Sequence, residues 1–280
     1  MPEIPTVRDD VKALRGLHLW HFAMSNCSQR VRLALEEKGV PWTSHHVDLS
    51  KNEHATPGFR AINPRGLVPV LVHDGRTIVE SNDVVAWLEE RFPGPRLLPE
   101  PAGDRDFALR SLAATDAIQP AIKLVSHEFL FKPMRRMSPT QLEEFAASCG
   151  DEALVRFMRD FSSKEGFGRA RISAAVGELE RAFGELESRL DGRPWLSGAS
   201  FGLADVSWIV NVHRVALARY PLGRFPRLDD WYRRVRSRPS FASAIAAWED
   251  RGARWFFAAY GRWRALRGTG IAAFTTPRAD

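Results

Sequence analysis

The sequence has little of what several large classes of protein need. Its 280 residues include only two cysteines, Cys27 and Cys149, which are too few for a disulfide framework, and no Cys/His cluster has zinc-ligand spacing. No stretch reaches the apolar length that spans a bilayer. Residues 1–10 lack the apolar core of a signal peptide. We therefore expect a cytoplasmic protein without a bound metal.

The charge pattern argues against a nucleic-acid partner. Lys and Arg total 40 and Asp and Glu total 34, for a formal net charge of +6, yet the two signs are interspersed without a long block of either. Repeats and low-complexity tracts are also missing from the sequence. A basic surface that favours anionic small molecules is compatible with these numbers.

A proline-rich segment divides the chain into two parts. Its prolines, which deny the backbone any regular element, are Pro93, Pro95, Pro99 and Pro101. Short strands alternate with helices before this segment, and the pattern after it is almost wholly helical. The predicted division is a first domain over 1–92, a linker over 93–103 and an all-helical domain over 104–280.

The first part predicts an α/β domain with the order β-α-β-α-β-β-α. The predicted strands are 18–22, 42–48, 70–73 and 76–79, and the predicted helices are 28–38, 57–62 and one that begins at Ser81. Gly39 is typical of a helix end, and Asp74-Gly75 of a tight hairpin turn. Because a β-α-β unit gives a parallel pair and a hairpin an antiparallel one, the sheet should be mixed.

The second part predicts helices throughout. They cover 104–131 with a kink before Pro120, a segment with apolar residues from Ile172 to Leu190, 203–220, 229–236 and 240–248. Residues 132–167 have no clear assignment. Gly202 and Asp205 are placed to cap the apolar helix that begins at Leu203. The basic, aromatic tail over 254–267 suits a membrane-surface helix, a lid or a packing helix, of which we favour the last two.

Three motifs follow one another in the first hundred residues. They are MSNCSQRVRLAL over 24–35, NPRGLVPV over 63–70, and the pair Glu80-Ser81. In this order they resemble the glutathione transferase superfamily, especially zeta-like enzymes, bacterial hydroquinone dehalogenases and β-etherases. The resemblance implies a thioredoxin-like domain that binds glutathione as co-substrate, and an all-helical domain that binds a hydrophobic substrate.

Ser25 is the candidate catalytic residue of the first motif. A thiol is a poor nucleophile until it ionises, and a hydroxyl before a helix N-terminus can hydrogen-bond its thiolate, with help from the helix dipole. Asn26 is a candidate second donor. The alternative is that Ser25 only caps the helix.

Cys27 is the competing candidate nucleophile of this motif. A thiol near a helix N-terminus can itself attack, as in glutaredoxin-like chemistry. The resemblance argues against this, because family members with a reactive Cys carry it five residues before the helix Arg, which is the position of Ser25 counted back from Arg30. Cys27 is then a resolving thiol or a small packed residue.

The resemblance also assigns the residues that hold the peptide. A cis bond before Pro69 would turn the Val68 backbone outward, where it could pair with an extended peptide. The Ser81 hydroxyl and the free N–H groups of its helix can hold the γ-glutamyl carboxylate, and Glu80 its ammonium.

The glycine carboxylate of glutathione needs a cation or a donor at the other end of the peptide. His54 is the candidate, because plant-type members carry a ligand-binding His at this place. The Lys that follows it in those enzymes is Ala55 here, which leaves Lys51 and Arg65 as alternatives.

The leading hypothesis is therefore an enzyme that activates glutathione to attack a hydrophobic, aromatic electrophile. Dehalogenation, β-aryl ether cleavage and conjugation are the possible reactions, in aromatic catabolism or detoxification. We expect a dimer without stable membrane insertion. Two alternatives stay open: a glutathione-binding interaction module without turnover, and a Cys27-dependent thiol oxidoreductase.

Overall fold

The computed structural model describes residues 3–149 and 151–277. They form two compact units, and each unit combines segments that are distant in sequence. The first contains the chain up to Asp116 together with 192–210 and 231–250, and the second contains 117–191, 211–230 and the chain from Arg251 onward. The domain division at 93–103 stays a prediction, and its outer limits, residues 1 and 280, lie outside the described residues.

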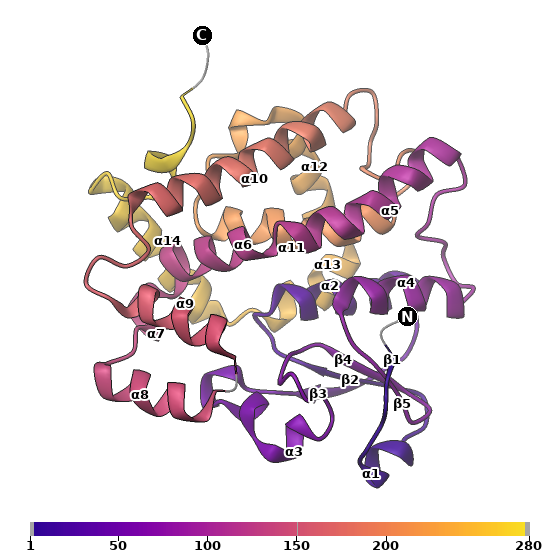
Figure 1. The fold of residues 1–280 in the computed structure, drawn as a ribbon. Coiled ribbons are helices and arrows are strands. Elements are labelled where there is room, and N and C mark those ends of the chain that lie inside the picture. The colour runs from indigo at the N-terminus through magenta and orange to yellow at the C-terminus, as the bar shows by residue number, and fades with distance from the viewer. Residues whose placement is uncertain (1–2, 150, 278–280) are drawn as a thin grey trace. The chain divides into compact units, whose positions relative to one another are not determined.

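A mixed five-stranded sheet is the centre of the first unit (Figure 1). Its strands are β1 (Glu3–Ile4), β2 (Leu17–His21), β3 (Thr43–His46), β4 (Val70–His73) and β5 (Arg76–Ile78), in the spatial order β1-β5-β4-β2-β3. β2 and β3 are parallel, and the other neighbouring pairs are antiparallel. This confirms the mixed sheet and adds the edge strand β1, which is too short to show a period in the sequence.

Helices cover both faces of this sheet. They are α1 (Asp9–Lys12), α2 (Asn26–Lys38), α3 (Pro57–Arg60) and α4 (Ser81–Arg91). The unit also contains most of α5 (Ala102–Ala117), and α13 (Pro239–Ala244), which packs against α2. Figure 1 shows α2 and α4 side by side over one face. On the other face, Val70 and Val72 of β4 pack with Phe59 of α3 and Val11 of α1. Gly39 ends α2 in the left-handed conformation, as predicted.

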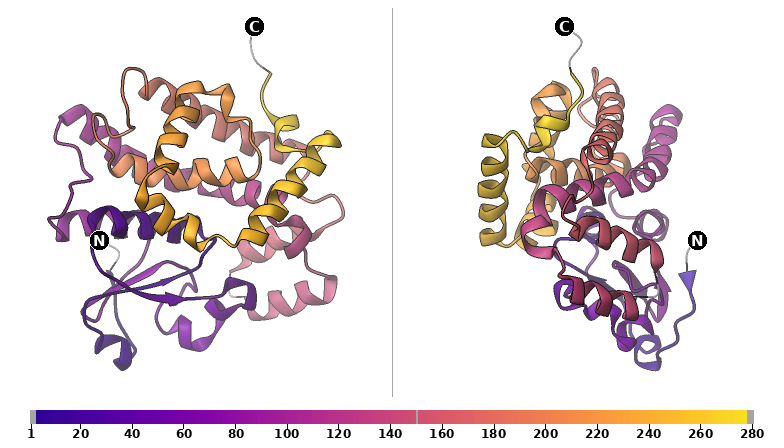
Figure 2. Two further views of the ribbon diagram at one scale, coloured as in Figure 1. Left: turned by 180° about the vertical axis from the view of Figure 1, so that it is seen from behind. Right: turned by 60° about the vertical axis from the view of Figure 1, so that its left-hand side comes forward.

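The second unit is helical. Its helices are α6 (Gln119–Ser126), a π-helical turn (His127–Phe131), α7 (Lys132–Arg135), α8 (Pro139–Ser148), α9 (Glu152–Ser162), α10 (Arg169–Arg189) and α14 (Arg251–Leu266). α11 (Leu203–Leu217) and α12 (Pro226–Arg236) contribute residues to both units. Figure 2 shows α14, in yellow, at the edge of this unit.

Most of the helical predictions are confirmed. The predicted helix over 104–131 is interrupted at Ile118, between α5 and α6 and just before Pro120. The unassigned residues 132–167 form α7, α8 and α9, and a capping box of Ser138 and Gln141 starts α8. The Asp205 carboxylate accepts the Gly202 amide, which confirms this half of the predicted cap. None of the helices in the described ranges is long and apolar enough to cross a membrane.

Candidate active site

The turn between β2 and α2 is held by a short set of hydrogen bonds. The Ser25 amide donates to the Phe22 carbonyl at 3.2 Å, and the Phe22 amide donates to the buried Ser28 hydroxyl at 3.3 Å. The Ser28 amide in turn donates to Ser25 Oγ at 3.3 Å, so Ser25 is the N-cap of α2. The local sequence thus places a serine hydroxyl at the positive end of a helix dipole.

Ser25 keeps one hydrogen-bonding group for a ligand. Its oxygen accepts the Ser28 amide, but no acceptor for its hydroxyl proton exists among residues 3–149 and 151–277. The side chain is half-buried. The capping role is therefore real, and it is compatible with donation to a thiolate, because a hydroxyl accepts and donates at once.

Asn26 and Cys27 lie in α2, and this corrects the predicted start of this helix at Ser28. α2 begins two residues before the predicted start because the Ser25 cap lets Asn26 and Cys27 adopt helical conformation. Asn26 is buried as the first helical residue, and Cys27, the second, is half-buried and forms no disulfide within the described residues.

Arg32 of α2 holds the same turn from within the protein. Its buried guanidinium donates to the carbonyls of Phe22 and Ala23, at 3.3 and 3.0 Å, and to the Ala244 carbonyl at 2.7 Å. Burial lowers the pKa of Arg32 to about 9, so it is charged at neutral pH. These bonds tie the residues that lead into Ser25 to the helix that follows it.

His21, at the end of β2, stays neutral beside this arginine. Burial, followed by the charge of Arg32, lowers the pKa of His21 to about 3. Its Nδ1 accepts from Arg32 at 3.1 Å, so Nε2 carries the proton and donates to the Ser44 hydroxyl at 2.8 Å. The strand is thereby fixed next to the turn.

Ser81 accepts a hydrogen bond from a second buried arginine, Arg30. Arg30 of α2 donates to Ser81 Oγ at 2.8 Å and to the Ser207 carbonyl at 3.3 Å. Burial lowers the pKa of Arg30, yet a guanidinium keeps its charge at neutral pH. Ser81 is the first residue of α4 and not its N-cap, which is Glu80. A simple capping role for Ser81 is therefore excluded.

The N-terminus of α4 can accept an anion. The amides of Ser81, Asn82 and Asp83 have no acceptor in the described part of the chain. The positive charge of Arg30, which donates to Ser81, adds to the positive end of the α4 dipole. Asp116 stands nearby, where it accepts the Asn82 side-chain amide at 2.7 Å and lies 3.9 Å from Arg30. Its carboxylate is exposed.

Glu80 has an unusual backbone and an ionic partner. Its φ of 61° lies in the left-handed region, which a side chain of this size rarely occupies. Arg65 donates to the Glu80 carboxylate in a surface ion pair. A ligand ammonium at Glu80 would therefore share the carboxylate with Arg65.

The Val68–Pro69 bond is cis, as the resemblance predicts. Val68 is half-buried and Pro69 is buried. Neither the Val68 amide nor its carbonyl has a hydrogen-bond partner within the described ranges. A main-chain donor and acceptor on one residue suit an extended peptide that pairs as a strand would.

His54 lies against the loop that leads to Val68. A Cβ on Gly66, whose φ is 64°, would be 2.9 Å from the His54 carbonyl oxygen, so only glycine allows this approach. His54 itself is half-buried. The two alternatives are already engaged: Lys51 pairs with Asp48 at 3.5 Å, and Arg65 with Glu80.

Comparison with known proteins places this chain in a family. Residues 24–91 match the family model of the glutathione S-transferase N-terminal domain, and 169–234 match that of its C-terminal domain. The chain is 35% identical over 155 residues to glutathione S-transferase 1 of Dianthus caryophyllus, covering 54% of this chain and 69% of that protein. This chain belongs to the glutathione S-transferase family.

Two further similar proteins carry more specific names. The tetrachloro-p-hydroquinone reductive dehalogenase of Sphingobium chlorophenolicum is 24% identical over 238 residues, which cover 81% of this chain and 94% of that protein. The crystal structure of beta-etherase LigF from Sphingobium sp. strain SYK-6 shares the fold, with a TM-score of 0.71 at 24% identity, covering 81% of this chain and 98% of the other.

Sequence reasoning missed three groups at the candidate site of this glutathione S-transferase family member. Arg30 served only to set the register of the first motif, and Arg32 and Asp116 were not singled out. Buried arginines on an otherwise apolar helix face are a signal for Arg30 and Arg32, because a buried charge needs partners. Asp116 carried no local signal. Metal-binding groups of three or more His, Cys, Asp or Glu residues are absent from the described residues.

Proposed function

We propose that this protein is a glutathione transferase in which Ser25 stabilises the thiolate of glutathione for attack on an aromatic electrophile. The observation that carries the proposal is the Ser25 hydroxyl, which caps α2 and still has its proton to donate. A thiolate there would receive a hydrogen bond from Ser25 and the field of the α2 N-terminus. Asn26 is proposed as a second donor.

The peptide portion of glutathione fits the groups around this hydroxyl. We assign the γ-glutamyl carboxylate to Ser81 and its helix amides above the Arg30 charge. The ammonium is assigned to the exposed carboxylates of Glu80 and Asp116. Val68 is assigned to pair with the peptide backbone, and His54 to the glycine carboxylate.

The proposed reaction is a nucleophilic substitution at carbon. The sulfur forms a C–S bond with the electrophile, and a halide or an aryloxide leaves with the bonding electron pair. The thiol proton is lost to solvent before the attack. Dehalogenation, β-aryl ether cleavage and conjugation share this first step, and the name of the hydroquinone dehalogenase supports an aromatic substrate. We propose that the all-helical domain supplies the hydrophobic site.

Calorimetry with glutathione, followed by a turnover panel, tests this proposal. The panel contains an aryl halide, a halogenated hydroquinone, a β-aryl ether and a cis–trans isomerisable diacid. Glutathione binding with turnover of an aryl substrate is the expected result. Binding without any turnover favours the interaction module, turnover of the diacid alone refutes the aromatic class, and failure to bind glutathione refutes the proposal as a whole.

Cys27 separates the proposal from the thiol oxidoreductase. Because Cys27 is inside α2 and Ser25 is its cap, Cys27→Ala should leave glutathione binding and aryl conjugation close to wild type. Disulfide reduction that is lost in Cys27→Ala and kept in Ser25→Ala would establish the oxidoreductase instead. Sedimentation equilibrium tests the expected dimer, and fractionation of the source cells tests the cytoplasmic location.

A further inference from the structure

α14 has a composition unlike that of an ordinary surface helix. It contains aromatic residues and four arginines but no acidic residue, and Arg267 follows it directly. Three large apolar side chains on it are exposed: Trp255 at 74%, Trp263 at 48% and Leu266 at 90%. The other exposed large apolar residues of the described chain are scattered over separate segments: Val7, Leu67, Leu109 and Met134.

These exposed residues share one side of α14. Trp255, Arg262 and Leu266 are separated by seven and four residues, which places them on one line along a helix. Arg264 is nine residues from Trp255, which is about two and a half turns at 3.6 residues per turn, so it lies on the opposite side of the helix. Arg264 and Phe257 are buried. We call the exposed side, with Trp255, Arg262, Trp263 and Leu266, the α14 outer face.

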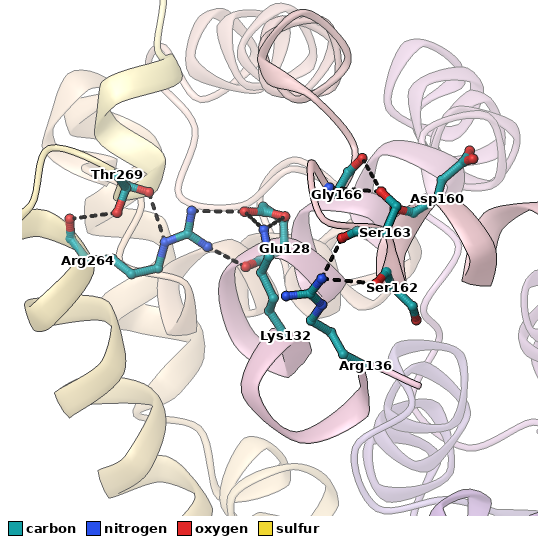
Figure 3. A network of polar contacts seen from close by, with 9 residues as sticks. All are labelled: Glu128, Lys132, Arg136, Asp160, Ser162, Ser163, Gly166, Arg264 and Thr269. Carbon is teal, nitrogen blue, oxygen red and sulfur yellow. Dashed lines mark hydrogen bonds and ion pairs between the residues drawn. The ribbon is translucent and has the colours of Figure 1, made fainter. Parts of the chain in front are cut away.

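The buried side anchors α14 firmly to its own unit. Figure 3 shows Arg264 between Thr269 and Glu128, a buried residue of the π-helical turn. Arg264 donates to the Glu128 carboxylate at 2.9 Å, and to the Thr269 carbonyl at 2.9 Å. Lys132 donates to the same carboxylate at 2.7 Å. The internal charge pair thus holds the helix while the outer face points to solvent.

We propose that the α14 outer face docks on an anionic phospholipid surface. Tryptophan and leucine can enter the interfacial layer, and the flanking guanidinium groups of Arg254 and Arg262 can bind lipid phosphates. A second copy of the chain is a poorer partner, because a two-fold contact would place the same arginines against each other. The docking is peripheral, because α14 is about 24 Å long at 1.5 Å per residue and no described helix is apolar enough to cross a bilayer.

Co-sedimentation of the full chain with lipid vesicles tests the docking. Phosphatidylcholine vesicles with and without phosphatidylglycerol are compared at low and high salt. Binding to the anionic vesicles should be strong at low salt and weaken as salt rises. Arg254→Gln with Arg262→Gln should lower the affinity about five-fold for each arginine. Trp255→Ser with Leu266→Ser should lower it about ten-fold or more, from lost apolar burial.

A matched control lies on α5, where Leu109 and Arg110 are adjacent and exposed. Leu109→Ser with Arg110→Gln removes the same kinds of group and should leave vesicle affinity unchanged. The proposal is overturned if anionic vesicles do not bind, if the control weakens binding as much as the α14 variants, or if the α14 variants abolish a dimer instead. Circular dichroism of each variant confirms that it is folded. The result is distinguishable from that of the glutathione assays, because none of these residues is assigned a part in glutathione binding.

Discussion

Ser25 has two roles that substitution can separate. As an N-cap it accepts the Ser28 amide at 3.3 Å. As the proposed thiolate stabiliser it donates its proton to sulfur. Alanine removes both roles, whereas glycine removes the donor but is a nearly adequate N-cap, and threonine keeps both. Comparison of Ser25→Ala, Ser25→Gly and Ser25→Thr therefore assigns each effect to one role.

The two effects have different expected sizes. Loss of the cap in Ser25→Ala should lower the free energy of unfolding by about 1 kcal/mol, and Ser25→Gly should lower it by only a few tenths. A hydrogen bond to a charged group contributes about 1.5–3 kcal/mol. At about 1.4 kcal/mol per pKa unit, its loss should raise the pKa of the bound glutathione thiol by about 1–2 units in both variants.

Two measurements check these values. Urea unfolding gives the stability of each variant, and thiolate absorbance of bound glutathione against pH gives the thiol pKa. Ser25→Thr should match wild type in both. The reasoning is refuted if Ser25→Gly leaves the thiol pKa unchanged, or if conjugation activity follows stability rather than thiol pKa, because Ser25 would then act only as a cap.

Three further predictions concern Arg32 and Asp205 in the first unit and His127 in the second. Arg32→Met leaves the buried carbonyls of the turn before α2 without their donor. It should lower the free energy of unfolding in urea by about 3 kcal/mol and weaken glutathione binding in calorimetry, with Arg32→Lys intermediate. Unchanged glutathione binding would show that Arg32 does not position the turn. Asp205→Ala removes the acceptor of three backbone amides and of the Trp231 indole. It should lower the free energy of unfolding in urea by about 3–5 kcal/mol, and a loss below about 1 kcal/mol would contradict this. Burial lowers the pKa of His127 from 6.5 to about 4, so below pH 6.5 only the unfolded chain takes up this proton, and stability should fall towards pH 4. His127→Gln should reduce that slope in urea unfolding by about 1.4 kcal/mol per pH unit, and an unchanged slope would show that His127 is not its source.

The sequence by itself determined the local parts of this protein. The hairpin at Asp74-Gly75, the end of α2 at Gly39 and the spacing along α10 follow from turn chemistry and periodicity, which act between neighbouring residues. The order of the three motifs was sufficient to predict the family. The N-cap role of Ser25 is also accessible from the sequence, because an N-cap is a local feature; its catalytic role stays a proposal.

Tertiary structure alone decided what surrounds the candidate site. Arg30 reaches Ser81 across 51 positions of sequence, and Arg32 reaches Ala244 across 212. No periodicity links residues so far apart, and their contact depends on how α2 packs against α4 and α13. The outer face of α14 has the same origin. Local chemistry selects the elements, but only packing decides which buried charge meets which partner and which side of a helix is left in solvent.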